Sequence, residues 1–158
     1  MIIIRKKINF LFYLSFVICF FLIVSNAYGY GYGNRGTKTN QSKSAENAKV
    51  FIVSPQDGAV VHSPVKIIFG SSKMEIIPAG VKKDFSGHHH LLIDVKKLPD
   101  LTQPIPADES HIHFGKGQTE VELSLSKGQH SLQLLLGDYS HIPHNKPVLS
   151  EKIHITVK

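Results

Sequence analysis

The chain has 158 residues, with 18 Lys and Arg against 12 Asp and Glu, a formal net charge of +6 and a single cysteine at position 19. The positive charges form no clustered basic stripe, which excludes a nucleic-acid-binding function. One cysteine cannot form an internal disulfide, so an apolar core has to stabilise the fold, and a domain of this length can supply one.

The N-terminus predicts export. Three basic residues, Arg5, Lys6 and Lys7, precede an apolar run over residues 8–24, and Ser25-Asn26-Ala27 follows with small residues at the −3 and −1 positions. This order predicts a signal peptide over residues 1–27, cleaved after Ala27. The alternative is an uncleaved anchor, because the run nearly reaches the length that spans a bilayer. In either case we expect the folded part to be periplasmic or secreted. The protein would contact the membrane only if the N-terminal segment is uncleaved, and then only through that segment.

Residues 28–48 combine a Gly-Tyr repeat with Ser, Thr, Asn, Gln and Lys and carry no aliphatic pattern. A segment that cannot bury apolar surface does not offset the entropy lost on ordering. We therefore predict a flexible linker over residues 28–48.

Residues 49–158 contain short β-type runs separated by turn residues. Strands are predicted over residues 49–53, 65–69, 88–95, 110–114, 119–125, 130–136 and 148–157. The leucines at 132, 134 and 136 alternate with other positions, as in a half-buried strand. About seven strands without a convincing helix predict an all-β fold, a small antiparallel β-sandwich with an immunoglobulin-like arrangement.

The histidines are clustered. Most fall into three groups: His88, His89 and His90; His111 and His113; and His141 and His144. In a strand, side chains at i and i+2 project from the same face about 6–7 Å apart. Two His-x-His pairs on neighbouring strands would therefore bring imidazoles together, a ligand set suited to copper or zinc where thiolates would oxidise.

Two further segments complete the predicted site. The loop that carries His141 and His144 follows Asp138 and would close the site, and Met74 would add a thioether that favours copper(I). The predicted metal ligands are thus His88, His90, His111, His113, His141, His144 and Met74.

Other roles for these histidines stay open at this point. The His-x-His pairs would also suit a hydrogen-bonded structural network or a sensor of pH, because imidazole changes charge near neutrality. His89 shares its face with Leu91 and Ile93, which predicts a place at the edge of the core. His130 precedes the leucines of its strand and is interpreted as a hydrogen-bonded inner residue.

Several motifs together resemble a known bacterial family. They are Gly87-His88-His89-His90, the Pro104 to Asp108 loop leading to His111-Ile112-His113-Phe114-Gly115, Gly117-Gln118-Thr119-Glu120, and Leu136-Gly137-Asp138 with His141-x-Pro143-His144. The chain resembles the exported domain of unknown function 4399 over about residues 50–157. The resemblance implies an exported domain whose histidine motifs share one surface, and it implies no activity.

We therefore expect an exported metal-binding protein, with copper before zinc, acting as a carrier or buffer. One alternative is a binding module without metal that recognises an envelope protein or glycan. The other is an enzyme of the superoxide dismutase type, which is disfavoured because the cysteine pair is missing and residues 49–158 contain no arginine, Arg35 lying in the linker. No catalytic residue is predicted, since no Gly-x-Ser-x-Gly motif is present.

Overall fold

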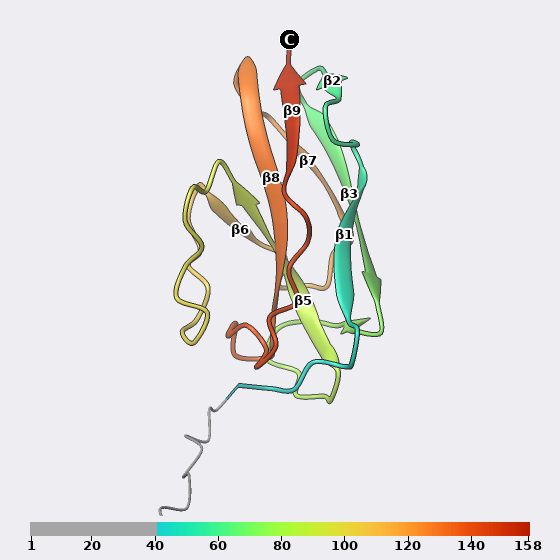
Figure 1. The fold of residues 1–158 in the computed structure, drawn as a ribbon, viewed down its shortest axis with the longest axis vertical. Coiled ribbons are helices and arrows are strands. Elements are labelled where there is room, and N and C mark those ends of the chain that lie inside the picture. Colours follow the sequence, from blue (N-terminus) through green and yellow to red (C-terminus); the bar gives the residue numbers. More distant parts are fainter. Residues whose placement is uncertain (1–40) are drawn as a thin grey trace, which may run out of the picture. The chain divides into compact units, whose positions relative to one another are not determined.

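The computed structural model describes residues 41–158, which contain strands and no helix. The strands are β1 (Lys49–Ser54), β2 (Val60–Val61), β3 (Val65–Ser72), β4 (Glu75–Ile76), β5 (Ser86–Ile93), β6 (His111–His113), β7 (Glu120–Leu123), β8 (Gly128–Gly137) and β9 (Ile153–Val157). They form two facing sheets (Figure 1).

The strand order confirms the predicted sandwich. One sheet has the order β1-β3-β7, and the other has β9-β8-β5 with β6 paired to the free side of β5. All these pairings are antiparallel, and the two-residue strands β2 and β4 add short parallel pairings. Apart from the two-residue strands, the chain crosses between the sheets after β3, β6 and β7, as it does in immunoglobulin-like sandwiches.

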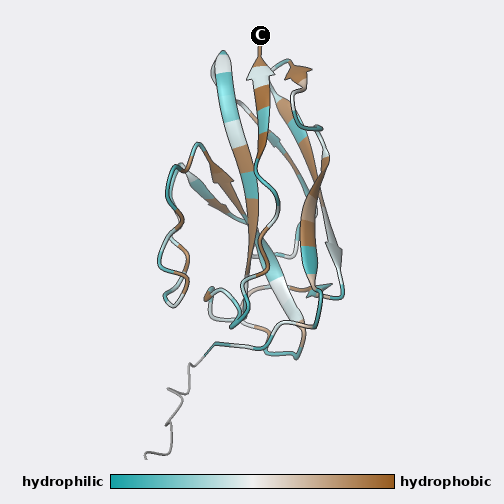
Figure 2. Ribbon diagram, in the orientation of Figure 1, coloured by the Kyte–Doolittle hydropathy of each residue, from teal (hydrophilic) through white to brown (hydrophobic). Residues whose placement is uncertain are grey.

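The main core lies between the two sheets. The alternating inward positions of β3, Val65, Ile67 and Phe69, face those of β8, where Leu132, Leu134 and Leu136 are fully buried. Figure 2 shows hydrophobic residues concentrated in the second half of β8, whereas the beginning of β5 is hydrophilic. The inward-facing leucines therefore lie in the core, as the sequence alternation predicted.

The prediction of a half-buried strand over residues 130–136 is wrong for the outward face. Leu92 and Leu135 point away from the main core, yet they are 1% and 0% exposed. The loops after β5 and β8 fold back over this face and form a second cluster with Ile105. Both faces of β5 and of the second half of β8 are consequently buried.

The last predicted strand is shorter than expected. Residues 148–152 make a single β-bridge with β8, Leu135 to Leu149, and the regular pairing with β8 is confined to β9. Beside this bridge, Val148 packs in the main core and Leu149 in the second cluster.

The predicted linker differs from the structure at its C-terminal end. Residues 41–48 lie against the domain, where Ala45 and Ala48 pack on the main core. The signal peptide over residues 1–27 and the rest of the linker lie outside the described residues. Within residues 41–158, no helix is long and apolar enough to cross a membrane.

Candidate metal centre

Strand register brings three histidines together on the outward face of the β5 sheet. His88 and His90 alternate with core-facing His89 along β5, and β6 pairs antiparallel so that His113 lies directly opposite His90. Side chains of directly opposed residues project from the same face. The three imidazoles therefore meet near the end of the sandwich where β5 begins and β8 ends (Figure 1).

A fourth imidazole comes from the turn after β8. Asp138 caps this turn: its Oδ1 accepts the backbone N–H groups of Ser140 at 2.8 Å and Ile142 at 3.1 Å. Its carbonyl oxygen accepts the His141 N–H at 2.9 Å. The turn holds His141 in the left-handed region with φ of 67° and brings its ring to the other three.

The four rings form a compact group. Ring centroids of His88, His113 and His141 lie 4.7–5.0 Å apart, and His90 lies 4.9 Å from His88 and 5.0 Å from His113. The longest separation is 6.1 Å, between His90 and His141. We call His88, His90, His113 and His141 the histidine cluster.

Two glycines make room for these rings. A Cβ atom on Gly137 would lie 2.7 Å from Cε1 of His90, and one on Gly115 would overlap the ring of His113. Real Cβ atoms do not approach other atoms so closely, so any larger residue would displace a ring. The glycines flanking the His motifs are therefore part of the site.

The buried nitrogen atoms of the cluster lack partners. Within residues 41–158, both ring nitrogens of His88 and His90 and Nε2 of His113 are buried without a hydrogen bond. Leaving such atoms unsatisfied costs about 1–3 kcal/mol each, which a purely structural network would avoid. The observation disfavours the hydrogen-bonded network and suits a ligand that accepts lone pairs.

The same surroundings keep the imidazoles of His88, His90 and His113 neutral. Burial, aided by repulsion from His113 and His141, lowers the pKa of His88 to about 4. Burial and the neighbouring His88 and His113 lower the pKa of His90 to about 2. Burial also lowers the pKa of His113, with a contribution from His141. At neutral pH these rings therefore carry free lone pairs, the form that binds metal ions.

The donor set fits a transition-metal ion. One nitrogen atom from each of His88, His113 and His141 lies within 4.8 Å of the others. Zinc–nitrogen bonds of about 2.0–2.1 Å place tetrahedral ligand nitrogens roughly 3.3 Å apart, so the distances between the three nitrogens would shorten by up to about 1.5 Å. These three residues could hold a metal ion, and His90 adjoins them as a fourth imidazole.

Three of the predicted ligands lie elsewhere. His111 is opposite Leu92 rather than a histidine, and its Nδ1 contacts Oδ1 of Asp108 at 2.8 Å. Met74 is buried in the main core, where its sulfur contacts the Ala45 N–H at 3.4 Å. The structure therefore does not bring His111 or Met74 into the cluster.

His144 lies on the opposite face of β5. A Cβ atom on Gly87, which would point to the same side as His89, would lie 3.1 Å from Cε1 of His144. Nε2 of His144 donates to the Ser86 carbonyl oxygen at 2.9 Å. His144 thus anchors the loop to β5, and the loop contributes His141 alone to the cluster.

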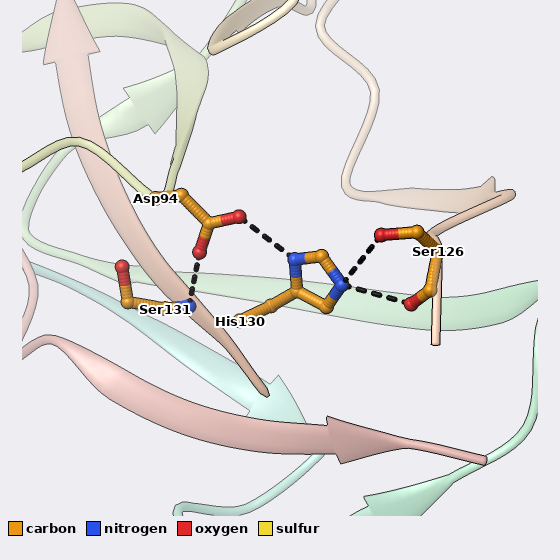
Figure 3. Close-up of polar contacts among 4 residues, drawn as sticks. All are labelled: Asp94, Ser126, His130 and Ser131. Atoms are coloured by element: carbon orange, nitrogen blue, oxygen red, sulfur yellow. Dashed lines mark hydrogen bonds and ion pairs between the residues drawn. The ribbon is translucent and has the colours of Figure 1, made fainter. Parts of the chain in front are cut away.

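His89 and His130 lie outside the cluster, and both ring nitrogens of His89 are also buried without a hydrogen bond within residues 41–158. His89 is fully buried against the Phe69 ring at 5.3 Å, deeper in the core than its expected place at the edge. His130 contacts Oδ2 of Asp94 at 2.7 Å and the Ser126 carbonyl oxygen at 2.9 Å (Figure 3). Both partners accept, so both ring nitrogens donate, as in a charged imidazolium.

Sequence reasoning missed the role of Asp138 as a buried cap. It is 1% exposed, and its negative charge favours the positively charged form of the neighbouring His88. A short polar residue directly after a strand-ending glycine is a common turn signal. The residue pattern therefore indicated a turn, whereas its position beside His88 needed the fold.

Comparison with known proteins gives a family and a similar solved structure. A family model described as "Domain of unknown function (DUF4399)" matches residues 67–158, more than half of the chain. A solved structure titled "Structures of Clostridium thermocellum CbhA fibronectin(III)-like modules" is similar with a TM-score of 0.36 and 14% identity, covering 68% of this chain and 92% of that one. No functionally curated protein matches the chain.

Proposed function

The chain belongs to the family described as domain of unknown function DUF4399, and we propose its function from the histidine cluster because that description names no activity. We propose that the protein binds a transition-metal ion through His88, His113 and His141. The observation that carries this proposal is the convergence of four imidazoles, in which both ring nitrogens of His88 and His90 and Nε2 of His113 are buried without a hydrogen-bond partner within residues 41–158. His90 supplies a fourth ligand when the site contracts.

Copper is the preferred ion. Imidazole ligands suit copper and zinc alike, and for a given nitrogen site the affinity of divalent ions rises to a maximum at copper. The cluster contains neither the carboxylate that magnesium or calcium prefers nor a thiolate. With Met74 in the core, the preference for copper rests on the imidazoles and not on a thioether.

The role proposed is that of an exported carrier or buffer in the periplasm or outside the cell. His113 and His141 are only partly buried, which leaves an ion accessible for exchange. The exported setting is proposed from the signal sequence of residues 1–27.

Calorimetric titration of the purified, metal-free exported protein with copper and zinc tests the proposal. We expect one ion per chain with a dissociation constant below about 10 μM, which corresponds to about 7 kcal/mol. His88→Ala and His113→Ala should each weaken binding at least tenfold, because each removes a direct ligand.

His111→Ala and His154→Ala are the matched controls, since both remove an imidazole from outside the cluster. Each should bind copper as tightly as the unaltered protein. A dissociation constant weaker than 10 μM for the unaltered protein, or equal losses for cluster and control variants, would exclude a metal site at the cluster.

A further inference from the structure

Residues 41–45 are fastened to the loop that carries the metal-binding turn. The side-chain amide of Gln41 donates to the carbonyl oxygens of Leu101 at 2.7 Å and Pro143 at 2.9 Å. The carbonyl oxygen of Ser42 accepts the Asn145 N–H at 3.0 Å. These contacts bridge about 60 to 100 positions of sequence, so they tie the start of the domain to the loop after β5 and to the loop after β8.

One contact reaches the cap of the turn itself. The Ser42 hydroxyl donates to Oδ2 of Asp138 at 2.7 Å, while Oδ1 of the same carboxylate accepts the two backbone N–H groups that shape the turn. Because Asp138 is buried, an unsatisfied Oδ2 would be costly, and the carboxylate would rotate or admit water. Ser42 therefore helps to hold the turn that positions His141.

We infer that residues 41–45 form a strap that positions the metal site, so that docking of the strap and binding of the metal ion strengthen each other. This inference rests on the proposed function. Coupling of this kind is reciprocal: if the docked strap tightens metal binding, the metal ion must stabilise the docked strap by the same factor. Undocking of the strap would then weaken metal binding without any competition for the imidazole nitrogens.

Ser42 acts as a positioning residue, and Ser42→Ala tests this role in the purified exported protein. We expect copper to bind about tenfold more weakly, as is typical when a residue that orients a metal ligand is removed. Ser44→Ala is the matched control, because within residues 41–158 the Ser44 hydroxyl makes no hydrogen bond, and it should leave the affinity unchanged. Ser42→Thr keeps the hydroxyl and should restore the affinity.

Amide hydrogen exchange measures the reciprocal effect. Saturating copper should slow exchange at Ser44 and Asn145, whose N–H groups join the strap to the loop, and leave β7 unchanged. If the strap had only a structural role, Ser42→Ala would lower the melting temperature and leave the copper affinity unchanged.

The outcomes separate the two ideas. If the unaltered protein binds no metal, both the proposed function and the strap's role are wrong. If it binds copper but Ser42→Ala binds equally tightly and exchange at Ser44 and Asn145 does not change, only the strap's role is wrong.

Discussion

His141 illustrates how a single residue combines backbone strain with a proposed ligand role. Its φ of 67° lies in the left-handed region, which costs an L-residue with a side chain roughly 1–2 kcal/mol. The capping bonds of Asp138 on both sides of His141 hold this conformation. A strained residue held by its surroundings and aimed at other imidazoles is typical of a binding site.

Replacement of His141 should separate ligand from strain. His141→Gly and His141→Ala should both weaken copper binding, because each removes the imidazole. We expect His141→Gly to be more stable than His141→Ala by about 1 kcal/mol, because only glycine adopts positive φ without steric cost. Urea denaturation measures the difference, and an alanine variant as stable as the glycine variant would show that the turn is unstrained.

At the level of the strands, β5 joins every part of the structure. Its core face packs on β3, its edges pair with β6 and β8, and its outward face carries His88 and His90. At its end, Asp94 binds the start of β8: Oδ1 accepts the Ser131 N–H at 2.7 Å, and Oδ2 contacts His130 (Figure 3). This contact fixes the β5–β8 register on which the positions of His88 and His90 depend.

The contact between Asp94 and His130 should make stability depend on pH. Burial alone lowers the pKa of His130, but the hydrogen bonds to Asp94 and Ser126 together with the Asp94 charge outweigh it and raise the pKa. A raised histidine pKa contributes stability that is complete below the unfolded value of about 6.5 and is lost as pH rises through the folded value.

Asp94→Ala should therefore lower the free energy of unfolding by roughly 1 kcal/mol or more at pH 6, from the lost hydrogen bonds, and by less at pH 9. Chemical denaturation at the two pH values measures the difference. His154→Ala, which removes an exposed histidine, serves as the control. A loss that is equal at both pH values would show that the charge of His130 does not contribute.

For the whole molecule, three consecutive buried histidines in β5 create a sensitivity to acid. Burial is the main reason that the pKa values of His88, His89 and His90 fall to about 4, about 4 and about 2. Once unfolded, these residues take up protons below pH 6.5, which the folded chain does not do. Their contribution to stability is complete above pH 6.5 and is lost as pH falls toward the folded values.

The metal-free protein should thus lose stability steeply between pH 6.5 and 4.5, by up to about 1.4 kcal/mol per pH unit for each of the three histidines. Urea denaturation in chelator-containing buffers across this range measures the slope. His89→Phe replaces a core histidine by an apolar ring. It should reduce the slope of the unfolding free energy against pH by up to about 1.4 kcal/mol per pH unit, the contribution of one histidine. A stability that is flat over this range would mean that the three rings are accessible to protons when folded.

Local pattern determined the elements of this fold because the direction of a side chain in a strand is a local property. Alternation with a period of two placed His88 and His90 on one face and His89 with Leu91 on the other, and turn residues separated the strands. The family resemblance likewise followed from sequence motifs, and the match over residues 67–158 confirms it. The β-sandwich and the joint placement of His88 and His90 were therefore predictable from the sequence.

Tertiary structure alone decided which segments meet. The register of β6 against β5 placed His113 opposite His90 and His111 opposite Leu92, although the two histidines are equivalent in their local pattern. Main-core packing took Met74 away from the site, and the Asp138 cap brought in His141 while His144 bound the other face of β5. Register and loop closure depend on contacts between residues distant in the chain, and local periodicity carries no information about them.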